Sequence, residues 1–415
     1  MTKKSDAPAI RFKGFSDAWE QRKLASLCEK FTDGDWIESK DQSDFGVRLV
    51  QTGNVGVAEY LDKTNNKKWI SEDTFDRLHC EEVLPGDILI SRLPEPAGRA
   101  CIVPLLGTKM ITAVDCTIVR TAPDMSNKFL VQYLSSQAYF DDVNTCLAGG
   151  TRQRISRGNL ANFNVPIPVK KSEQDAIGMF FGYLDNLITL HQRKFEKLTN
   201  VKKSMLEKMF PQNGSSYPEI RFKGFTDPWE QRKLGDIADI VGGGTPSTGN
   251  QSYWDGDIDW YAPAEIADQI YANSSQKKIT GLGYENSSAK MLPPGTVLFT
   301  SRAGIGKTAI LTRKGCTNQG FQSIVPHRGE LDSYFIFSRT EELKRYGELV
   351  GAGSTFVEVS GKQMAVMELM MPPTMREQQT IGGFFQQLDH LITLHQRELE
   401  KLQNIKKSML EKMFV

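Results

Sequence analysis

The chain has 415 residues, more than a single hydrophobic core usually holds, so we expect two or more domains. Its 51 Lys and Arg nearly balance its 50 Asp and Glu, which excludes a strong overall positive field, so any nucleic-acid surface must be local. The N-terminal residues MTKKSDAPAI have no apolar core for export, and no run approaches the roughly 20 apolar residues of a membrane span. We therefore expect a cytoplasmic protein that does not enter a membrane.

The six cysteines form no CxxC pair and no Cys/His group with the spacing of metal ligands. We expect them to be reduced thiols, mostly buried, and we expect no metal site.

A tryptophan-bearing segment near the start of the chain occurs twice. IRFKGFSDAWEQRKL at Ile10–Leu24 returns as IRFKGFTDPWEQRKL at Ile220–Leu234. The chain is therefore a tandem repeat of one unit.

After Leu24 the first copy contains short apolar segments, such as GVRLVQTGNVG and DILISR, separated by glycine, proline and asparagine, which predict strands. Apolar residues at helical spacing predict a helix from Asn127 to Val143. A loop and a short strand follow in Leu147–Pro168. The second copy has the same outline, but its interior shares little with the first beyond that framework.

Each copy ends in a long helix with an apolar seam, and DNLITLHQ in the first recurs as DHLITLHQ in the second. The seam residues recur at steps of three and four, which is heptad spacing: Leu184, Ile188, Phe195 and Leu198 in the first helix, and Leu388, Ile392, Leu399 and Leu402 in the second. His191, Lys202, His395 and Lys406 also fall on this spacing. We expect the two helices to bury each other's seams; the alternative is that each helix packs on its own domain.

The predicted fold is α+β, with two tandem α/β domains joined by long antiparallel coiled-coil helices. We place the domains at 1–168 and 213–371, and the helices at 169–212 and 372–415. Thr374 and Glu377 predict a capping box at the start of the second helix. A continuous helix from Ser172 to Phe210 would be about 58 Å long at 1.5 Å per residue.

Cationic side chains gather in glycine-containing loops of both copies. They are Arg92, Arg99, Arg152, Arg154 and Arg157 in the first copy, and Arg302 and Lys307 in the second. Arginine suits phosphates and guanine edges, and glycine lets the backbone approach a partner, so these residues are the candidate DNA contacts. The alternative is a solvated charged face. At the places of Arg152 and Arg154 the second copy has Phe356 and Glu358, which fits two readers with different targets.

SRAGIGKT at Ser301–Thr308 resembles a phosphate-binding P-loop, but serine stands where the P-loop requires its first glycine. We find no nucleophile elbow, HExxH or paired Asp/His arrangement, and therefore expect no catalytic residue.

The chain resembles the specificity subunit of type I restriction-modification enzymes over essentially its whole length. The resemblance is carried by WEQRKL at Trp19–Leu24 and Trp229–Leu234, GGTPS at Gly243–Ser247, the run from GTRQRIS to VPIP, and REQQ at Arg376–Gln379. The first copy lacks GGTPS and has CEKFTDGDW near that place.

The resemblance implies a non-catalytic subunit with two target recognition domains, each reading one half of an asymmetric bipartite site in double-stranded DNA. The helices would set the gap between the halves and dock methylation subunits, two by expectation, that use S-adenosylmethionine. Restriction subunits that use ATP and Mg would join them, so that the chain directs adenine methylation or restriction without a cofactor of its own. The alternatives are a two-domain coiled-coil scaffold that does not bind DNA, and an enzyme with an unrecognised site.

Overall fold

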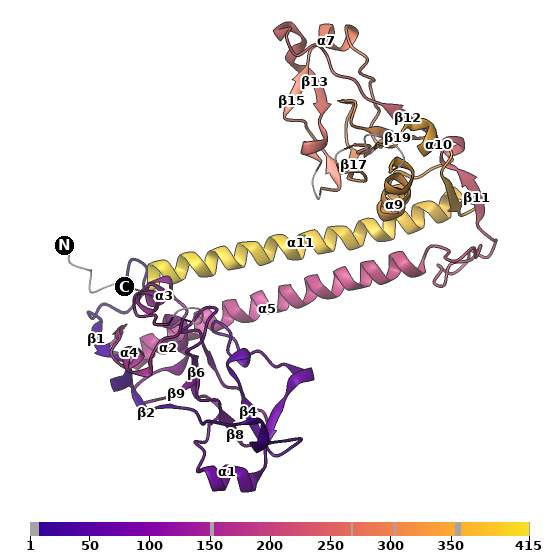
Figure 1. Ribbon diagram of the computed structural model, residues 1–415. Coiled ribbons are helices and arrows are strands. Elements are labelled where there is room, and N and C mark those ends of the chain that lie inside the picture. The colour runs from indigo at the N-terminus through magenta and orange to yellow at the C-terminus, as the bar shows by residue number, and fades with distance from the viewer. Residues whose placement is uncertain (1–7, 150–152, 267–268, 303, 353–357, 415) are drawn as a thin grey trace. The chain divides into compact units, whose positions relative to one another are not determined.

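The structure is a computed structural model that describes residues 8–149, 153–266, 269–302, 304–352 and 358–414 (Figure 1). The chain divides into two compact units. The first comprises Met1–Gln192 with Arg397–Val415, and the second comprises Arg193–Gln396. These units differ from the domain boundaries predicted from sequence, because each unit takes a part of both long helices.

The first unit contains two four-stranded sheets and a two-stranded ladder. One sheet has the order β2-β9-β6-β7 and is antiparallel throughout; the other has the order β3-β5-β4-β8, with β4 and β8 parallel. The strands are β1 (Glu20–Lys23), β2 (Cys28–Asp33), β3 (Gln42–Ser43), β4 (Val47–Val50), β5 (Lys68–Ile70), β6 (Ile88–Ser91), β7 (Ala100–Ile102), β8 (Met110–Thr112), β9 (Cys116–Thr121) and β10 (Asn164–Ile167). The ladder joins β1 to β10, and so ties the tryptophan segment to the strand before the long helix.

The helices of the first unit are α1 (Glu72–Leu78), α2 (Asn127–Tyr133), α3 (Gln137–Thr145), α4 (Arg157–Ala161) and the first part of α5 (Lys171–Lys208). The single helix predicted from Asn127 to Val143 was wrong, because the segment forms two helices. Ser136 interrupts it by accepting a hydrogen bond from the Tyr139 N–H as the N-cap of α3.

The second unit has a five-stranded sheet of order β12-β19-β16-β17-β14, a three-stranded sheet β15-β13-β18, and the ladder β11-β20. Its strands are β11 (Glu230–Lys233), β12 (Ala238–Gly242), β13 (Trp254–Tyr261), β14 (Tyr271–Ala272), β15 (Lys277–Ile279), β16 (Val297–Phe299), β17 (Thr308–Leu311), β18 (Cys316–Thr317), β19 (Gln322–Pro326) and β20 (Glu368–Met371). Its helices are α6 (Leu234–Ile237), α7 (Gly281–Glu285), α8 (Ser333–Ser338), α9 (Thr340–Gly351), α10 (Gly361–Ala365) and the first part of α11 (Met375–Met413).

Each unit buries the last turn of the long helix that belongs to the other repeat. In the first unit, Phe414 lies among Trp19, Phe129 and Phe181, at ring-centroid distances of 6.4, 5.4 and 5.9 Å. In the second unit, the corresponding Phe210 lies 6.0 Å from the ring of Trp229. Phe414, which is far along the chain from the rest of its core, therefore completes the first core, and Phe210 completes the second.

Phe210 also lies 5.6 Å from the ring of Phe335 and 6.0 Å from that of Phe385. These two residues occupy in the second unit the places that Phe129 and Phe181 occupy in the first.

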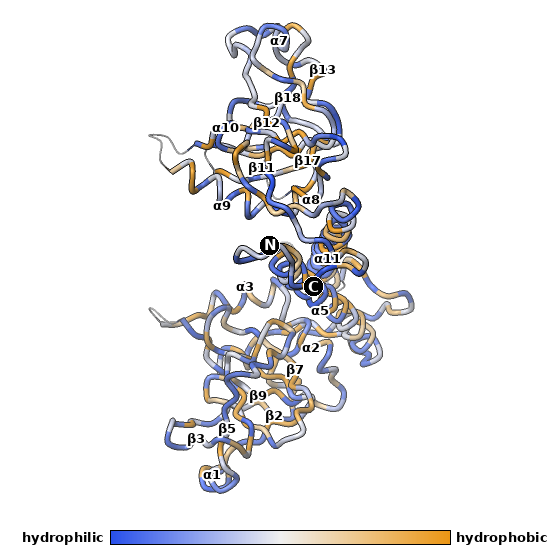
Figure 2. Tube along the Cα trace, turned by 90° about the vertical axis from the view of Figure 1, so that its right-hand side faces the viewer, coloured by the Kyte–Doolittle hydropathy of each residue, from blue (hydrophilic) through white to orange (hydrophobic). Residues whose placement is uncertain are grey.

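Parts of α5 and α11 run side by side in each unit (Figure 1), and their coils contain both hydrophilic and hydrophobic residues in Figure 2. In the first unit Asp185, in the first half of α5, pairs with Lys406, in the last quarter of α11, at 2.5 Å. In the second, Lys202 pairs with Asp389 at 2.6 Å. Early residues of one helix meet late residues of the other, so the pairing is antiparallel, as predicted.

The two aspartates also fix the helix pair to the globular domain of their unit. Asp185 accepts a hydrogen bond from Gln132 of α2 at 2.7 Å, and Asp389 accepts one from Tyr334 of α8 at 2.8 Å. The lysine on each seam is therefore paired, and a paired charge among apolar neighbours favours one register of the helices over a slipped one.

The start of each long helix is held by the tryptophan segment. The Arg11 guanidinium donates to both carboxylate oxygens of Glu173, at 2.6 and 2.8 Å, and the Trp19 indole N–H donates to the same carboxylate at 3.4 Å. These hydrogen bonds raise the pKa of Arg11, which stays charged.

Arg221, Trp229 and Glu377 repeat the arrangement at 2.7, 2.9 and 3.3 Å. The capping box predicted for Thr374 and Glu377 is half formed: the Glu377 N–H donates to the Thr374 hydroxyl, but the Glu377 carboxylate binds Arg221.

The cysteines are free thiols, in agreement with the prediction. Burial raises the pKa of Cys28 and Cys101 to about 12, and that of Cys116 and Cys316 to about 11, so these thiols stay protonated and inert at neutral pH. Over the part of the chain that the structure describes, we find no helix with the length and apolar character needed to cross a membrane.

Candidate nucleic-acid interface

Three of the predicted arginines of the first unit share two aspartates where β2, β6 and β9 meet the loops. Asp33, the last residue of β2, lies 3.5 Å from the Arg92 Nε and 3.8 Å from the Arg157 Nε. Asp115, in the turn before β9, lies 3.8 Å from an Arg154 nitrogen. We name this set of five residues the first edge.

Arg154 and Arg157 are the accessible cations of the first edge. Their side chains are 62% and 46% exposed, so each can exchange a long and weak ion pair for a phosphate. Backbone hydrogen bonds between Ala148 and Arg154 fix where the loop returns, and Ser156 caps α4, which begins at Arg157. Arg152, the third arginine of the predicted cluster, lies outside the described residues.

Arg92 and Arg99 bind the protein's own backbone. Arg99 donates to four carbonyl oxygens, those of Thr52, Val55, Leu93 and Pro96, at 2.7 to 3.0 Å, and burial lowers its pKa. Arg92 donates to the Val114 carbonyl at 2.6 Å. Few N–H groups of Arg99 remain free to bind DNA, and its hydrogen bonds stabilise its own loop. A DNA contact of Arg99 stays a prediction.

The second unit builds an edge on the same backbone hydrogen bonds. In the first unit the Ser91 N–H donates to the Arg99 carbonyl, and the Ile155 N–H donates to the Arg92 carbonyl. In the second unit the Thr300 N–H donates to the Lys307 carbonyl, and the Val359 N–H donates to the Ser301 carbonyl. Lys307 thus occupies the place of Arg99, and Ser301 that of Arg92. The Ser-Arg pair that both copies contain would instead match Arg302 with Arg92, so the structural match is shifted by one residue.

Arg302 and Lys307 are both exposed on this second edge. Arg302 pairs with Glu358 at 2.7 Å, so the acidic residue that replaces Arg154 neutralises a neighbouring cation. Phe356, which replaces Arg152, lies outside the described residues. The two edges therefore share a framework and differ in charge.

The loop Ser301–Lys307 is a strand-to-strand turn. It joins β16 to β17, with Gly304 and Gly306 at positive φ, whereas a P-loop leads into a helix whose N-terminus holds the phosphate. The segment is therefore a turn between two antiparallel strands and does not have the form of a P-loop.

GGTPS and the segment that replaces it in the first copy occupy equivalent places. A Cβ on Gly34 would lie 2.3 Å from the Thr112 carbonyl oxygen, and one on Gly243 would lie 2.3 Å from the Thr317 carbonyl oxygen. At the next residue the Asp35 N–H donates to Thr112 and the Gly244 N–H donates to Thr317. Only glycine fits the first position, and the residue two positions later is Trp36 in one unit and Thr245 in the other.

Sequence reasoning missed Asp33, Asp115 and Trp36. The signal available was weak: Asp33 and Trp36 belong to the DGDW segment that stands near the place of GGTPS, but nothing local connects Asp33 with Arg157. Among the described residues, no group of three or more His, Cys, Asp and Glu is placed to hold a metal ion.

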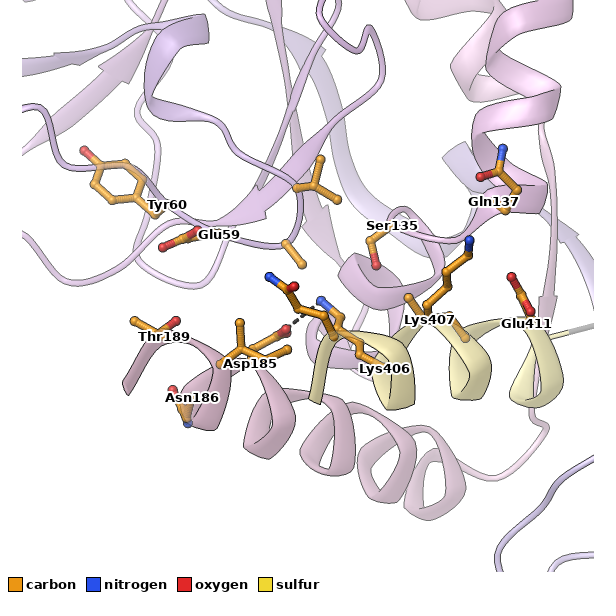
Figure 3. A pocket seen from close by; sticks show the side chains of 15 residues that line it. Glu59, Tyr60, Ser135, Gln137, Asp185, Asn186, Thr189, Lys406, Lys407 and Glu411 are labelled. Atoms are coloured by element: carbon orange, nitrogen blue, oxygen red, sulfur yellow. Dashed lines mark ion pairs between the residues drawn. The ribbon is translucent and has the colours of Figure 1, made fainter. Parts of the chain in front are cut away.

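The seam residues differ in burial. Leu184, Leu388 and Leu399 are buried, whereas Ile188, Phe195, Leu198, Ile392 and Leu402 are half-buried. Ile188 lines a groove of about 560 Å³ in the first unit, where α5 and α11 face the loop carrying Glu59 and Tyr60 (Figure 3). Lys406 and Asp185 close the floor of this groove with their ion pair.

A protein-family model described as "Type I restriction modification DNA specificity domain" matches residues 16–200 and again residues 226–404. The type I restriction enzyme MjaIX specificity subunit of Methanocaldococcus jannaschii is 34% identical over 190 residues, which is 45% of this chain and only 44% of that protein. The putative type I restriction enzyme MjaX specificity subunit of the same organism is 22% identical over 94% of this chain and 92% of its own.

Among solved structures, the S subunit of a type I restriction-modification system from M. genitalium matches with a TM-score of 0.65 at 14% identity, over 99% of both chains. At that identity the likeness concerns the fold, which has the same two-domain form as the one predicted from sequence. The family match covers both repeats, from the tryptophan segment into the long helix. The chain belongs to the family of type I restriction-modification DNA specificity proteins, and it carries one specificity domain in each repeat.

Proposed function

We propose that this chain is the specificity subunit of a type I restriction-modification complex, in which each edge reads one half of an asymmetric, bipartite DNA site. The observation that carries this proposal is the pair of edges. They are built on the same backbone hydrogen bonds, yet the first presents Arg154 and Arg157 and the second presents Arg302 paired with Glu358. One framework with different side chains is what two readers of different sequences require.

The partners follow from the family. The long helices set the distance between the two readers and bind methylation subunits. We propose that there are two methylation subunits and that they use S-adenosylmethionine. Restriction subunits that use ATP and Mg complete the complex. The chain itself positions these enzymes for adenine methylation or cleavage and contributes no catalytic residue. A scaffold that does not bind DNA is disfavoured by membership in a DNA specificity family.

Exchange of the first interior tests the two-reader arrangement. Replacing residues from Ala25 to Phe163 by the equivalent region of a related chain is expected to change one half of the methylated motif and leave the other unchanged. The junctions are suitable because Leu24 and Phe163 are hydrogen-bonded to each other, while the β1–β10 ladder and the Arg11–Glu173 pair lie outside the exchange.

Methylome sequencing of cells carrying the exchanged chain and its partners gives the readout. Loss or change of both halves together, with methylation still active, would contradict the two-reader arrangement. Absence of any site-specific methylation by the parent chain would contradict the proposed function itself.

Lengthening both helices tests whether they set the gap. Seven residues added after Gln192 in α5, and seven after Gln396 in α11, extend each helix by about 10 Å, close to three base pairs at about 3.4 Å each. These points lie between the two units, and a whole heptad keeps the seam on the same face. We expect the same half-sites with a gap longer by about two or three base pairs in the methylome.

The insertion point matters, because Leu198 and Val201 pack against the second core and an insertion between Thr199 and Asn200 would disturb them. Seven residues added to the exposed linker after Asn213 serve as the control and should leave the gap unchanged. Active methylation with an unaltered gap in the lengthened helices would show that they do not set it.

A further inference from the structure

Trp36 is the tryptophan most exposed to solvent in the described part of the chain. Its relative exposure is 71%, whereas Trp19, Trp229 and Trp260 are each exposed by 6% or less. A large aromatic side chain left in solvent is uncommon in a stable domain, and aromatic residues are enriched where proteins meet partners. Exposure alone does not identify the partner; the place of Trp36 in the fold does.

Backbone and side-chain contacts connect Trp36 to the first edge. Asp33, three residues earlier, holds Arg92 and Arg157. The Asp35 carbonyl, adjacent to Trp36, accepts the Val114 N–H, and the Val114 carbonyl accepts a hydrogen bond from Arg92. Trp36 therefore directly follows a residue that is hydrogen-bonded to the turn before β9, where Asp115 pairs with Arg154.

The first edge is cationic once its internal pairs are counted. Three arginines share two aspartates, so these five residues carry one net positive charge. Glu38 is paired with Lys40 at 2.8 Å and also accepts a hydrogen bond from the Trp36 indole. An exposed aromatic ring close in sequence to a cationic edge suits a nucleic acid as partner. Phosphates can pair with the arginines, and a base or a thymine methyl group can pack against the ring.

The equivalent position of the second unit has different chemistry. Thr245 stands there, and its hydroxyl donates to the Gln319 side-chain oxygen at 2.5 Å. The second edge thus offers a polar contact where the first offers an aromatic one, which is a difference between readers and not a shared element of the framework.

We propose that Trp36 is a DNA contact of the first recognition domain, and that its ring packs against a base of the half-site read by that domain. This inference rests on the proposed function. The contact is apolar, so it contributes to affinity and base preference without adding to the number of phosphates neutralised. Arg154 and Arg157, by contrast, would pair with phosphates, so each would add to the number of phosphates neutralised.

This difference gives the test. The chain, purified with its methylation partner, is titrated with duplex DNA that carries the motif found methylated in cells, at several salt concentrations. Trp36→Ala is expected to weaken binding by on the order of ten-fold and leave the slope of log K against log salt unchanged, whereas Arg157→Ala should lower that slope by about one. Trp36→Phe keeps a ring and should recover part of the affinity.

Phe45→Ala is the matched control. Phe45 is 81% exposed and precedes β4, whereas Asp35, the residue before Trp36, pairs with Ala113, which follows β8. Because β4 and β8 are parallel, the two aromatics lie at opposite ends of that sheet. Duplexes altered in one half-site add specificity: Trp36→Ala should reduce the penalty for changes in the half assigned to the first unit and keep the penalty for the other half.

Unchanged binding by Trp36→Ala, with normal binding by the parent complex, would overturn the inference and leave the proposed function standing. Weaker binding that arises because Trp36→Ala no longer holds its methylation partner, measured by light scattering, would also overturn it and place the indole in a protein interface. Failure of the parent complex to bind the motif would refute the inference together with the proposed function.

Discussion

Replacing Phe414 by alanine is expected to destabilise the first unit by about 3 to 5 kcal/mol, the usual loss for truncating a buried phenylalanine. The side chain is 7% exposed and touches the rings of Trp19, Phe129 and Phe181, which come from three separate segments of the first unit. Its removal leaves a cavity between these segments, which have little freedom to close around it. A substitution near the end of the chain should therefore loosen a domain whose sequence begins near the start.

Hydrogen exchange followed by mass spectrometry locates the effect, since two units need not unfold in a single transition. Phe414→Ala should raise exchange in β1, α2 and β10, and Phe210→Ala should raise it in β11, α8 and β20. Glu411→Ala changes an exposed residue of the same turn and should alter neither. Equal loosening of both units by Phe414→Ala would contradict the assignment of this side chain to one core.

Glu173→Gln is expected to cost the first unit about 3 kcal/mol, because removing one member of a buried ion pair leaves the other without compensation. The Glu173 side chain is only 2% exposed and accepts hydrogen bonds from Arg11 and Trp19. A glutamine keeps the shape, but it has a single acceptor oxygen and no charge for the arginine. The measurement is the midpoint of chemical denaturation of the first unit, which is monitored through the hydrogen exchange of β1 and α2.

Two comparisons sharpen this result. Glu377→Gln should act in the same way on the second unit, where Arg221 and Trp229 bind it. Lys170→Ala breaks a solvent-exposed pair with Asp17 one residue before α5 and should change little, since exposed pairs contribute little to stability. If Glu173→Gln behaved like Lys170→Ala, the carboxylate would not be what fastens the tryptophan segment to the helix.

The elements that sequence predicted well are those with local periodicity or repetition. Heptad spacing identified Leu184 and Leu388 as buried seam residues, and the duplicated segments identified the tandem units. Both patterns can be recognised from residues that are close together in the sequence. The seam lysines were visible too, but their aspartate partners were not, since Lys406 and Asp185 meet only after the two helices pair.

Contacts between distant segments account for what was missed. Arg11 and Glu173 are separated by 162 positions, and no pattern in either segment points to the other. One signal existed: arginine and glutamate recur at matching places in both copies, as Arg221 and Glu377. For the edges, sequence found the arginines but could not separate Arg99, which binds four carbonyl oxygens of its own chain, from Arg154, which faces solvent.

The placement of Phe414 in the first core has a consequence for synthesis of the protein. A ribosome adds about 5 to 20 residues per second, so Phe129 and Phe181 emerge roughly ten seconds or more before the ring that covers them. The second unit is continuous in sequence from Arg193 to Gln396 and has all its core residues sooner. The domain begun first is thus finished last, and while translation continues its apolar surface is open to chaperones, to proteases and to other nascent chains.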